Sequence, residues 1–259
     1  MAQNRASAFR QRLMARETLL GTFVQTPATH PVEILGSLGF DFLVIDGEHG
    51  PFDRVAMDAA ILAARAMDVP CLARVPEANA ARLLAVLDDG ATGVVVPHVA
   101  SAAIAREVAE ACRYKPGRRG FSNSTRAGGY GARAMWDHVE VSDREVVVAA
   151  IIEDPEALDE IDAIAGVDGI DVLLIGRGDL TMAMRAASPD APEIQAATRT
   201  IAMAAKAAGK IAWLNVGSVD EARAMSASLG ITCFSTGSDQ AFLREAASSS
   251  LAAFRVVRS

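Results

Sequence analysis

Titratable side chains follow several short apolar runs of this 259-residue sequence, and these positions are where chemistry is expected. The clearest case is the stretch 40–50, in which a mostly apolar run ends at Asp46 and is followed by Glu48 and His49. A histidine can take up and return a proton near neutral pH, so His49 is a candidate general base that Asp46 could orient. The stretch could also be no more than a polar turn after a core strand.

A second apolar run, 71–75, carries Arg74. Its permanent charge could hold a keto or carboxylate oxygen and favour a developing enolate. Alternatively, Arg74 could be a structural partner of Asp88 or Glu77.

Glu153 and Asp179 each follow a further apolar run and together suggest a metal site. Two carboxylates with open water positions suit a hard divalent ion such as Mg²⁺ or Mn²⁺. Asp179 could instead cap the next helix, and the N–H groups of Gly178 and Asp179 could bind a substrate carboxylate there. His98 also ends an apolar run and could line the same site. No His/Cys cluster favours zinc.

Eight short apolar runs alternate with helical patterns along the chain. The predicted strands are residues 19–25, 40–45, 71–75, 94–96, 146–152, 172–175, 211–215 and 231–235. Continuous apolar strands are typical of parallel sheets covered on both faces. Eight such units without a linker predict one (β/α)8 barrel over 1–259, although a doubly wound sheet is an alternative. In a barrel the carboxyl ends of the strands face one way, so the polar residues would converge.

The helices have recognisable caps, with one interruption between them. Asp53 is predicted to cap a helix over 54–67, and its apolar side is expected to hold Val55, Ala59, Leu62 and Ala66. Residues 114–140 form a long Gly/Arg-rich loop with one short helix near 131–138. A loop of this length is either functional or a solvated excursion.

The composition excludes several classes of protein. The net charge is −7 and there is no long basic cluster, so nucleic acid and anionic membranes are unlikely partners. The three cysteines lie far apart without a CxxC spacing, which predicts small buried side chains and no disulfide framework or zinc site. The N-terminal residues lack a signal-peptide core and no run is long enough to span a membrane, so a cytoplasmic protein is expected.

The sequence also resembles a known family. The stretch 41–51 (DFLVIDGEHGP) is closely similar to the HpcH/HpaI aldolases, class II pyruvate aldolases. Further matches over residues 18–256 occur in the right order: 73–76 (ARVP), 87–91 (LDDGA), 94–97 (VVVP), 119–120 (RG), 152–153 (IE), 169–176 (GIDVLLIG) and 178–181 (GDLT).

The resemblance implies a (β/α)8 barrel that assembles as a homo-hexamer, a trimer of dimers, with the last helix exchanged between neighbours. It also implies reversible cleavage of 4-hydroxy-2-oxo acids to pyruvate and an aldehyde, with a divalent metal ion (Mg²⁺, Mn²⁺ or Co²⁺) as cofactor.

Site roles follow from the matched positions. Glu153 and Asp179 would bind the metal, and the N–H groups of Gly178 and Asp179 would bind the pyruvate carboxylate. His49 would be the base, acting through a water on the metal, with Asp46 as its partner. Arg74 would bind the keto oxygen and stabilise the enolate. Asp88 matches an aspartate that assists the site, either within the chain or from a neighbouring subunit.

Several departures separate the chain from the family pattern, and one of them is the segment 114–120, which is one residue shorter than usual. Ile151 replaces a common Gln, Arg177 replaces a common Pro, and Trp213 replaces a smaller residue and is expected to narrow the aldehyde side of the pocket. Two alternatives remain for the function: a lyase acting on an acyl-CoA thioester, and a catalytically silent binding barrel.

Overall fold

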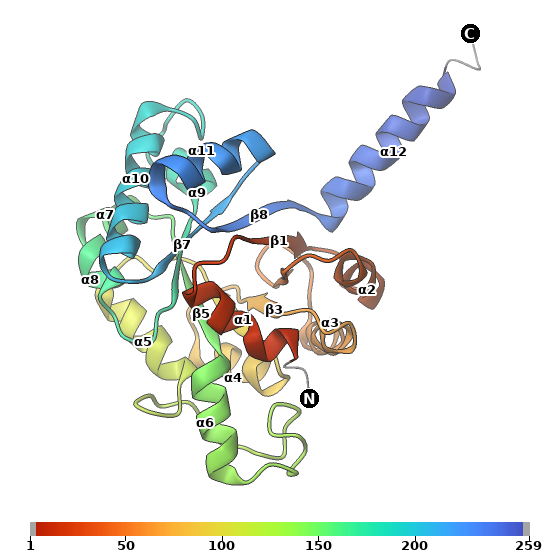
Figure 1. The fold of residues 1–259 in the computed structure, drawn as a ribbon, viewed down its shortest axis with the longest axis vertical. Helices are drawn as coiled ribbons and strands as arrows, with labels where there is room; N and C mark the ends of the chain where they lie inside the picture. The colour runs from red at the N-terminus through yellow and green to blue at the C-terminus, as the bar shows by residue number, and fades with distance from the viewer. Residues whose placement is uncertain (1–3, 256–259) are drawn as a thin grey trace.

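Eight parallel strands form a closed barrel in the computed structural model, which describes residues 4–255 (Figure 1). The strands pair in chain order, and β8 returns to pair with β1. They are β1 (Leu19–Val24), β2 (Phe42–Asp46), β3 (Cys71–Arg74), β4 (Gly93–Val96), β5 (Val147–Ile152), β6 (Val172–Ile175), β7 (Ile211–Asn215) and β8 (Cys233–Ser238). The predicted (β/α)8 barrel is therefore confirmed, and the doubly wound sheet is excluded.

Helices follow the strands and cover the outside of the barrel (Figure 1). Those among residues 4–255 are α1 (Arg5–Met14), α2 (Thr29–Ser37), α3 (Arg54–Ala66), α4 (Ala80–Asp88), α5 (Ala102–Cys112), α6 (Met135–Glu145), α7 (Pro155–Asp159), α8 (Ile161–Ala165), α9 (Arg177–Ala183), α10 (Pro192–Ala207), α11 (Val219–Leu229) and α12 (Asp239–Arg255). None of these helices combines the length and the apolar character needed to cross a membrane.

The barrel has two cores because alternate residues of each strand face opposite sides. The inner core fills the barrel, where the rings of Phe42 and Trp213 meet edge to face with centroids 5.1 Å apart. The outer core lies between the strands and the helices and includes Ile45 and Leu214. Cys71, Cys112 and Cys233 are buried and unpaired, which confirms the prediction that they are small buried side chains.

Helix α1 covers the amino end of the barrel. Its Phe9 and Leu13 join the inner core, and the Phe9 ring lies 5.4 Å from that of Phe42. This end of the barrel is therefore closed by packing, and the opposite end is left for chemistry.

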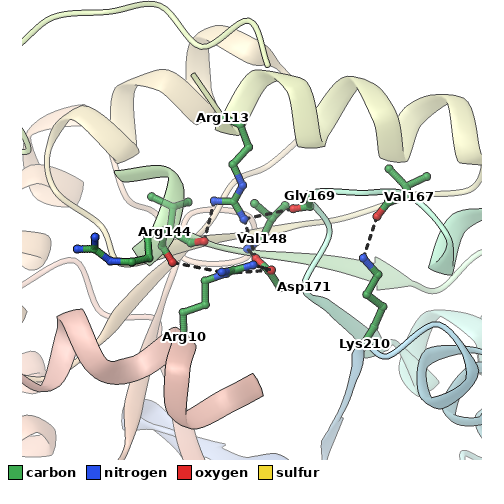
Figure 2. Close-up of polar contacts among 9 residues, drawn as sticks. Arg10, Arg113, Arg144, Val148, Val167, Gly169, Asp171 and Lys210 are labelled. Carbon is green, nitrogen blue, oxygen red and sulfur yellow. Dashed lines mark hydrogen bonds and ion pairs between the residues drawn. The ribbon is translucent and has the colours of Figure 1, made fainter. Parts of the chain in front are cut away.

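A buried carboxylate fastens the same end (Figure 2). Oδ1 of Asp171 accepts hydrogen bonds from Arg10 Nε and Nη2 at 3.0 and 2.7 Å. Its Oδ2 accepts from Arg113 Nη2 at 2.8 Å and from the Val148 N–H at 2.9 Å. Asp171 directly precedes β6, and its side chain thus joins the start of β6 to α1, to the end of α5 and to β5.

Helix α3 buries a face other than the predicted one. Asp53 caps it as expected, accepting the Ala56 N–H at 2.8 Å. However, Val55 is 75% exposed and Leu62 is 50% exposed. The buried residues are Met57, Ala60, Ile61, Ala63 and Ala64. Abundant alanine offers several stripes of helical period, and the sequence alone does not select among them.

The long loop packs against the amino end of the barrel and does not line its mouth. Arg119 Nη2 donates to Asp88 Oδ1 at 2.9 Å, and Arg126 Nη1 donates to the Asp89 carbonyl at 2.9 Å. Both acceptors lie where α4 ends, just before β4 begins. The helix that follows is α6, Met135–Glu145, so the short helix predicted near 131–138 was placed too early.

Helix α12 projects away from the barrel (Figure 1). None of its described residues is buried within the chain. Its first turn stays attached, since Phe242 stacks on Phe40 with ring centroids 6.4 Å apart.

Candidate active site

Asp46 and Arg74 form a fixed pair at the mouth of the barrel. They end the neighbouring strands β2 and β3 and lie in register. Arg74 Nε donates to Asp46 Oδ1 at 2.9 Å and Nη2 donates to Oδ2 at 2.7 Å, which is a bidentate pair. Asp46 is 0% exposed. Burial would raise the pKa of this carboxyl, but Arg74, together with the hydrogen bonds from the His49 N–H and from Gln25, lowers it.

Two further contacts hold the Arg74 guanidinium. Its Nη1 lies 3.1 Å from Glu48 Oε2, and its Cζ lies 5.1 Å from the centre of the Phe23 ring. Arg74 is therefore not the partner of Asp88 or Glu77, which pair with Arg119 and Arg82. Glu48 is therefore the second carboxylate, after Asp46, that holds the Arg74 guanidinium in place.

His49 lies at the open rim, with its side chain 58% exposed and Nε2 3.8 Å from Glu48 Oε2. Asp46 contacts His49 through the backbone, because Asp46 Oδ1 accepts the His49 N–H at 3.1 Å. The expectation that Asp46 orients the imidazole is not what the geometry shows. The Asp46 carboxylate is occupied by Arg74 and by Gln25 Nε2, the latter at 3.0 Å, and Asp46 shapes the turn that carries His49.

Glu153 lies after β5 and is 4% exposed. One of its oxygens accepts the backbone N–H of His98 at 2.9 Å, and His98 Nδ1 lies 3.6 Å from the same oxygen. Burial raises the pKa of Glu153, and the negative charges of Asp179 and Glu48 raise it further. A cation beside Glu153 would offset this repulsion.

Asp179 lies in the first turn of α9 and is exposed. Gly176 occupies the cap position of that helix, so Asp179 is not the N-cap. A side chain at Gly176 would collide with Glu153, since an added Cβ would lie 2.5 Å from the Glu153 Cβ. Glycine at 176 thus lets the start of α9, which carries Asp179, approach Glu153.

The two carboxylates fit a divalent cation whose remaining ligands come from substrate and water. Carboxylate oxygens are the donors that Mg²⁺ and Mn²⁺ prefer. Between residues 4 and 255 no cluster of three or more His, Cys, Asp or Glu side chains could enclose a metal ion. The residues present therefore suit an open site and not a closed structural one.

Trp213 lies deeper than expected. It is 1% exposed, its Nε1 donates to Ser235 Oγ at 3.0 Å, and its ring stacks near Phe23 with centroids 6.3 Å apart. At this depth the indole does not reach the aldehyde side of the pocket, which it was expected to narrow. The indole belongs to the inner core and forms a floor beneath Phe23.

Asp88 lies at the other end of the barrel. It ends α4, which runs back from the mouth to the start of β4, and it pairs with Arg119. Within one chain Asp88 is thus separated from His49 and Arg74.

Four residues around the mouth were not found from the sequence: Phe23, Gln25, Asn215 and Ser235. Each lies on the inward-facing register of β1, β7 or β8, or directly follows it. The period of two along each strand was the signal that could have found them.

Taken together, the barrel and its mouth define a class: a (β/α)8 enzyme with a fixed arginine and a carboxylate pair, suited to stabilising an oxyanion. The family model described as HpcH/HpaI aldolase/citrate lyase matches residues 19–246. The chain belongs to this family, and it is an enzyme of the carbon–carbon lyase class.

Individual relatives agree with this assignment. A hydroxypyruvate/pyruvate aldolase of Cupriavidus necator is 35% identical over 95% of this chain and 92% of its own. A 4-hydroxy-2-oxovalerate aldolase of Rhodococcus jostii is 34% identical over 80% of this chain and 81% of its own. The crystal structure of an HpcH/HpaI aldolase/citrate lyase family protein from Burkholderia cenocepacia superposes with a TM-score of 0.90 and 26% identity, covering 98% and 100% of the two chains.

Proposed function

We propose that the protein is a divalent-metal-dependent aldolase that reversibly cleaves 4-hydroxy-2-oxo acids to pyruvate and an aldehyde. The observation that supports this most directly is Arg74, whose guanidinium is held by Asp46, Glu48 and Phe23 at the mouth of the barrel. A positive charge that is already in place needs no reorganisation when negative charge develops on a nearby oxygen.

Glu153 and Asp179 would hold the cation, which would act as a Lewis acid toward the 2-oxo acid. The backbone N–H groups of Gly178 and Asp179 would bind the substrate carboxylate. No atom lies within 4 Å of a Cβ added to Gly178, so this segment has room for a ligand.

In the cleavage direction His49 accepts the proton of the C4 hydroxyl. The C–O electrons form the aldehyde carbonyl, the C3–C4 bond breaks, and its electron pair forms the enolate of pyruvate. Arg74 stabilises the enolate oxygen, and a proton added at C3 completes pyruvate. The exposed position of His49 allows the proton to exchange with water.

Exchange of the pyruvate methyl protons with deuterium, followed by NMR, tests this proposal without an aldehyde. We expect metal-dependent exchange that His49→Ala slows by about 10²-fold or more. Glu153→Gln should weaken Mn²⁺ binding measured by calorimetry. His30→Ala and Glu33→Gln, which change exposed residues of α2, are matched controls. Exchange that persists unchanged in His49→Ala or after chelation would contradict the assigned roles.

The two other functions give different results in the same experiments. A lyase for acyl-CoA thioesters would turn over such a thioester and would not exchange pyruvate protons. A silent barrel would bind neither Mn²⁺ nor pyruvate.

A further inference from the structure

A polar chain rises from the inner core to the mouth of the barrel. It starts at Trp213 on β7, passes through Ser235 on β8 and ends at Asn215, the last residue of β7. Trp213 and Asn215 are two residues apart and so share the inward face of the strand. Asn215 and Ser235 lie opposite each other in the strand register. Trp213 and Ser235 are buried, whereas Asn215 is exposed.

The first hydrogen bond in this chain has a direction fixed by chemistry. An indole N–H can only donate, so Ser235 Oγ must accept from Trp213 Nε1, at 3.0 Å. The Ser235 proton is then free to donate to Asn215 Oδ1, at 3.2 Å. With Oδ1 facing Ser235, the NH₂ end of this exposed amide points away from Ser235. No residue between 4 and 255 accepts a hydrogen bond from Asn215 Nδ2.

The backbone at the end of β7 is also held by a side chain of α9. Arg177 Nη2 donates to the Asn215 carbonyl at 3.0 Å and forms an ion pair with Glu221 of α11. Asn215 is thus fixed both through its side chain and through its backbone.

We propose that Asn215 is a specificity-determining residue that donates a hydrogen bond to a hydroxyl oxygen on the acceptor aldehyde, and that Ser235 positions it. The proposal rests on the proposed function. The residues that would hold pyruvate lie on β3, directly after β5 and in the first turn of α9, so a donor on β7 faces another part of the substrate. The floor on this side is the apolar pair Phe23 and Trp213. Asn215 therefore discriminates hydroxylated aldehydes from alkyl aldehydes of the same size.

Glycolaldehyde and propionaldehyde test this directly, because they have the same number of non-hydrogen atoms and differ by a hydroxyl in place of a methyl group. The measurement is kcat/KM for each aldehyde with saturating pyruvate. We expect the wild-type protein to prefer glycolaldehyde, and Asn215→Leu, which keeps the size but removes the donors, to lower the preference about 3- to 10-fold. Asn215→Ala, which needs no additional space, should lower it in the same direction.

Ser235→Ala separates positioning from a general structural effect. It should raise the KM for glycolaldehyde and leave the KM for pyruvate unchanged, because the freed amide can turn its carbonyl toward the ligand. Ser228→Ala, at an exposed position of α11, is the matched control and should preserve the wild-type preference.

The outcomes distinguish this inference from the proposed function. An active wild-type protein whose preference is unchanged in both Asn215 variants, or whose two aldehydes are affected equally, overturns the inference alone. A wild-type protein that neither exchanges pyruvate protons nor forms product with either aldehyde overturns the proposed function and the inference with it.

Discussion

Arg74 shows how a single side chain is prepared for chemistry. Its guanidinium pairs in a planar, bidentate manner with Asp46, contacts Glu48 with the remaining nitrogen and lies over Phe23. Burial would raise the pKa of Asp46, but Arg74, the His49 N–H and Gln25 together lower it. The position of the positive charge is therefore set before a substrate arrives.

Arg74→Lys keeps the charge but loses the planar fork. We expect kcat/KM for aldol cleavage to fall about 10²–10³-fold, the size of effect seen when one oxyanion-stabilising donor is lost. Steady-state kinetics with a 4-hydroxy-2-oxo acid gives the value. Arg82→Lys changes an exposed arginine of α4 and is the control. Activity within about threefold of wild type would show that the geometry of the pair is unimportant.

At the level of helices and strands, the amino end of the barrel stabilises the fold and the carboxyl end carries the polar residues of the site. At the amino end, α1 fills the opening with Phe9 and Leu13, and Asp171 joins it to Arg10 and Arg113 (Figure 2). At the carboxyl end, strand ends and short turns carry the polar residues. Stability and chemistry are thus placed at opposite ends of the same strands.

Asp171→Ala tests the stabilising role of the amino end. Removing this carboxylate leaves the buried guanidinium of Arg113 without its partner, which costs about 3–5 kcal/mol of unfolding free energy. Urea unfolding measures the loss. Asp168→Ala, an exposed position nearby, should change stability by less than about 0.5 kcal/mol. Equal effects of the two substitutions would show that the network adds nothing to stability.

On the scale of the whole molecule, α12 is the element that a single chain leaves incomplete. Its apolar side chains Leu243, Leu251 and Phe254 are exposed and lie on one face of the helix. A separate apolar surface on β1, β8 and α11 includes Leu20, Val219 and Phe234. We propose that α12 of a second copy covers this surface, within a homo-hexamer built as a trimer of dimers. Asp88 would then assist a site only from a neighbouring subunit.

Leu251→Glu combined with Phe254→Glu should break this assembly, because two charges would enter an apolar interface. Light scattering coupled to size-exclusion chromatography should show a hexamer for the wild-type protein and a smaller species for the variant. Ser249→Glu, on the opposite face of α12, should leave the mass unchanged. A monomeric wild-type protein would contradict both the helix exchange and the role suggested for Asp88.

Local patterns predicted much of this protein. Apolar runs separated by helices gave eight strands with ends close to those observed, and Asp53 caps α3 as expected. Strand patterns and helix caps depend on residues a few positions apart, so a local stretch of sequence is enough to predict them. The stretch 40–50 likewise indicated a strand that ends in titratable groups.

Other features depend on residues that are distant in the sequence. The partner of Asp46 is Arg74, the two carboxylates Glu48 and Asp46 share one guanidinium, and Asp88 lies at the end of the barrel away from His49. The buried face of α3 and the depth of Trp213 were decided in the same way, by which surfaces meet when the barrel closes. The sequence alone determined the elements, the family and the residue types at the strand ends. Only the tertiary structure decided their pairing and direction, because hydrogen bonds and packing act between atoms that chain order does not bring together.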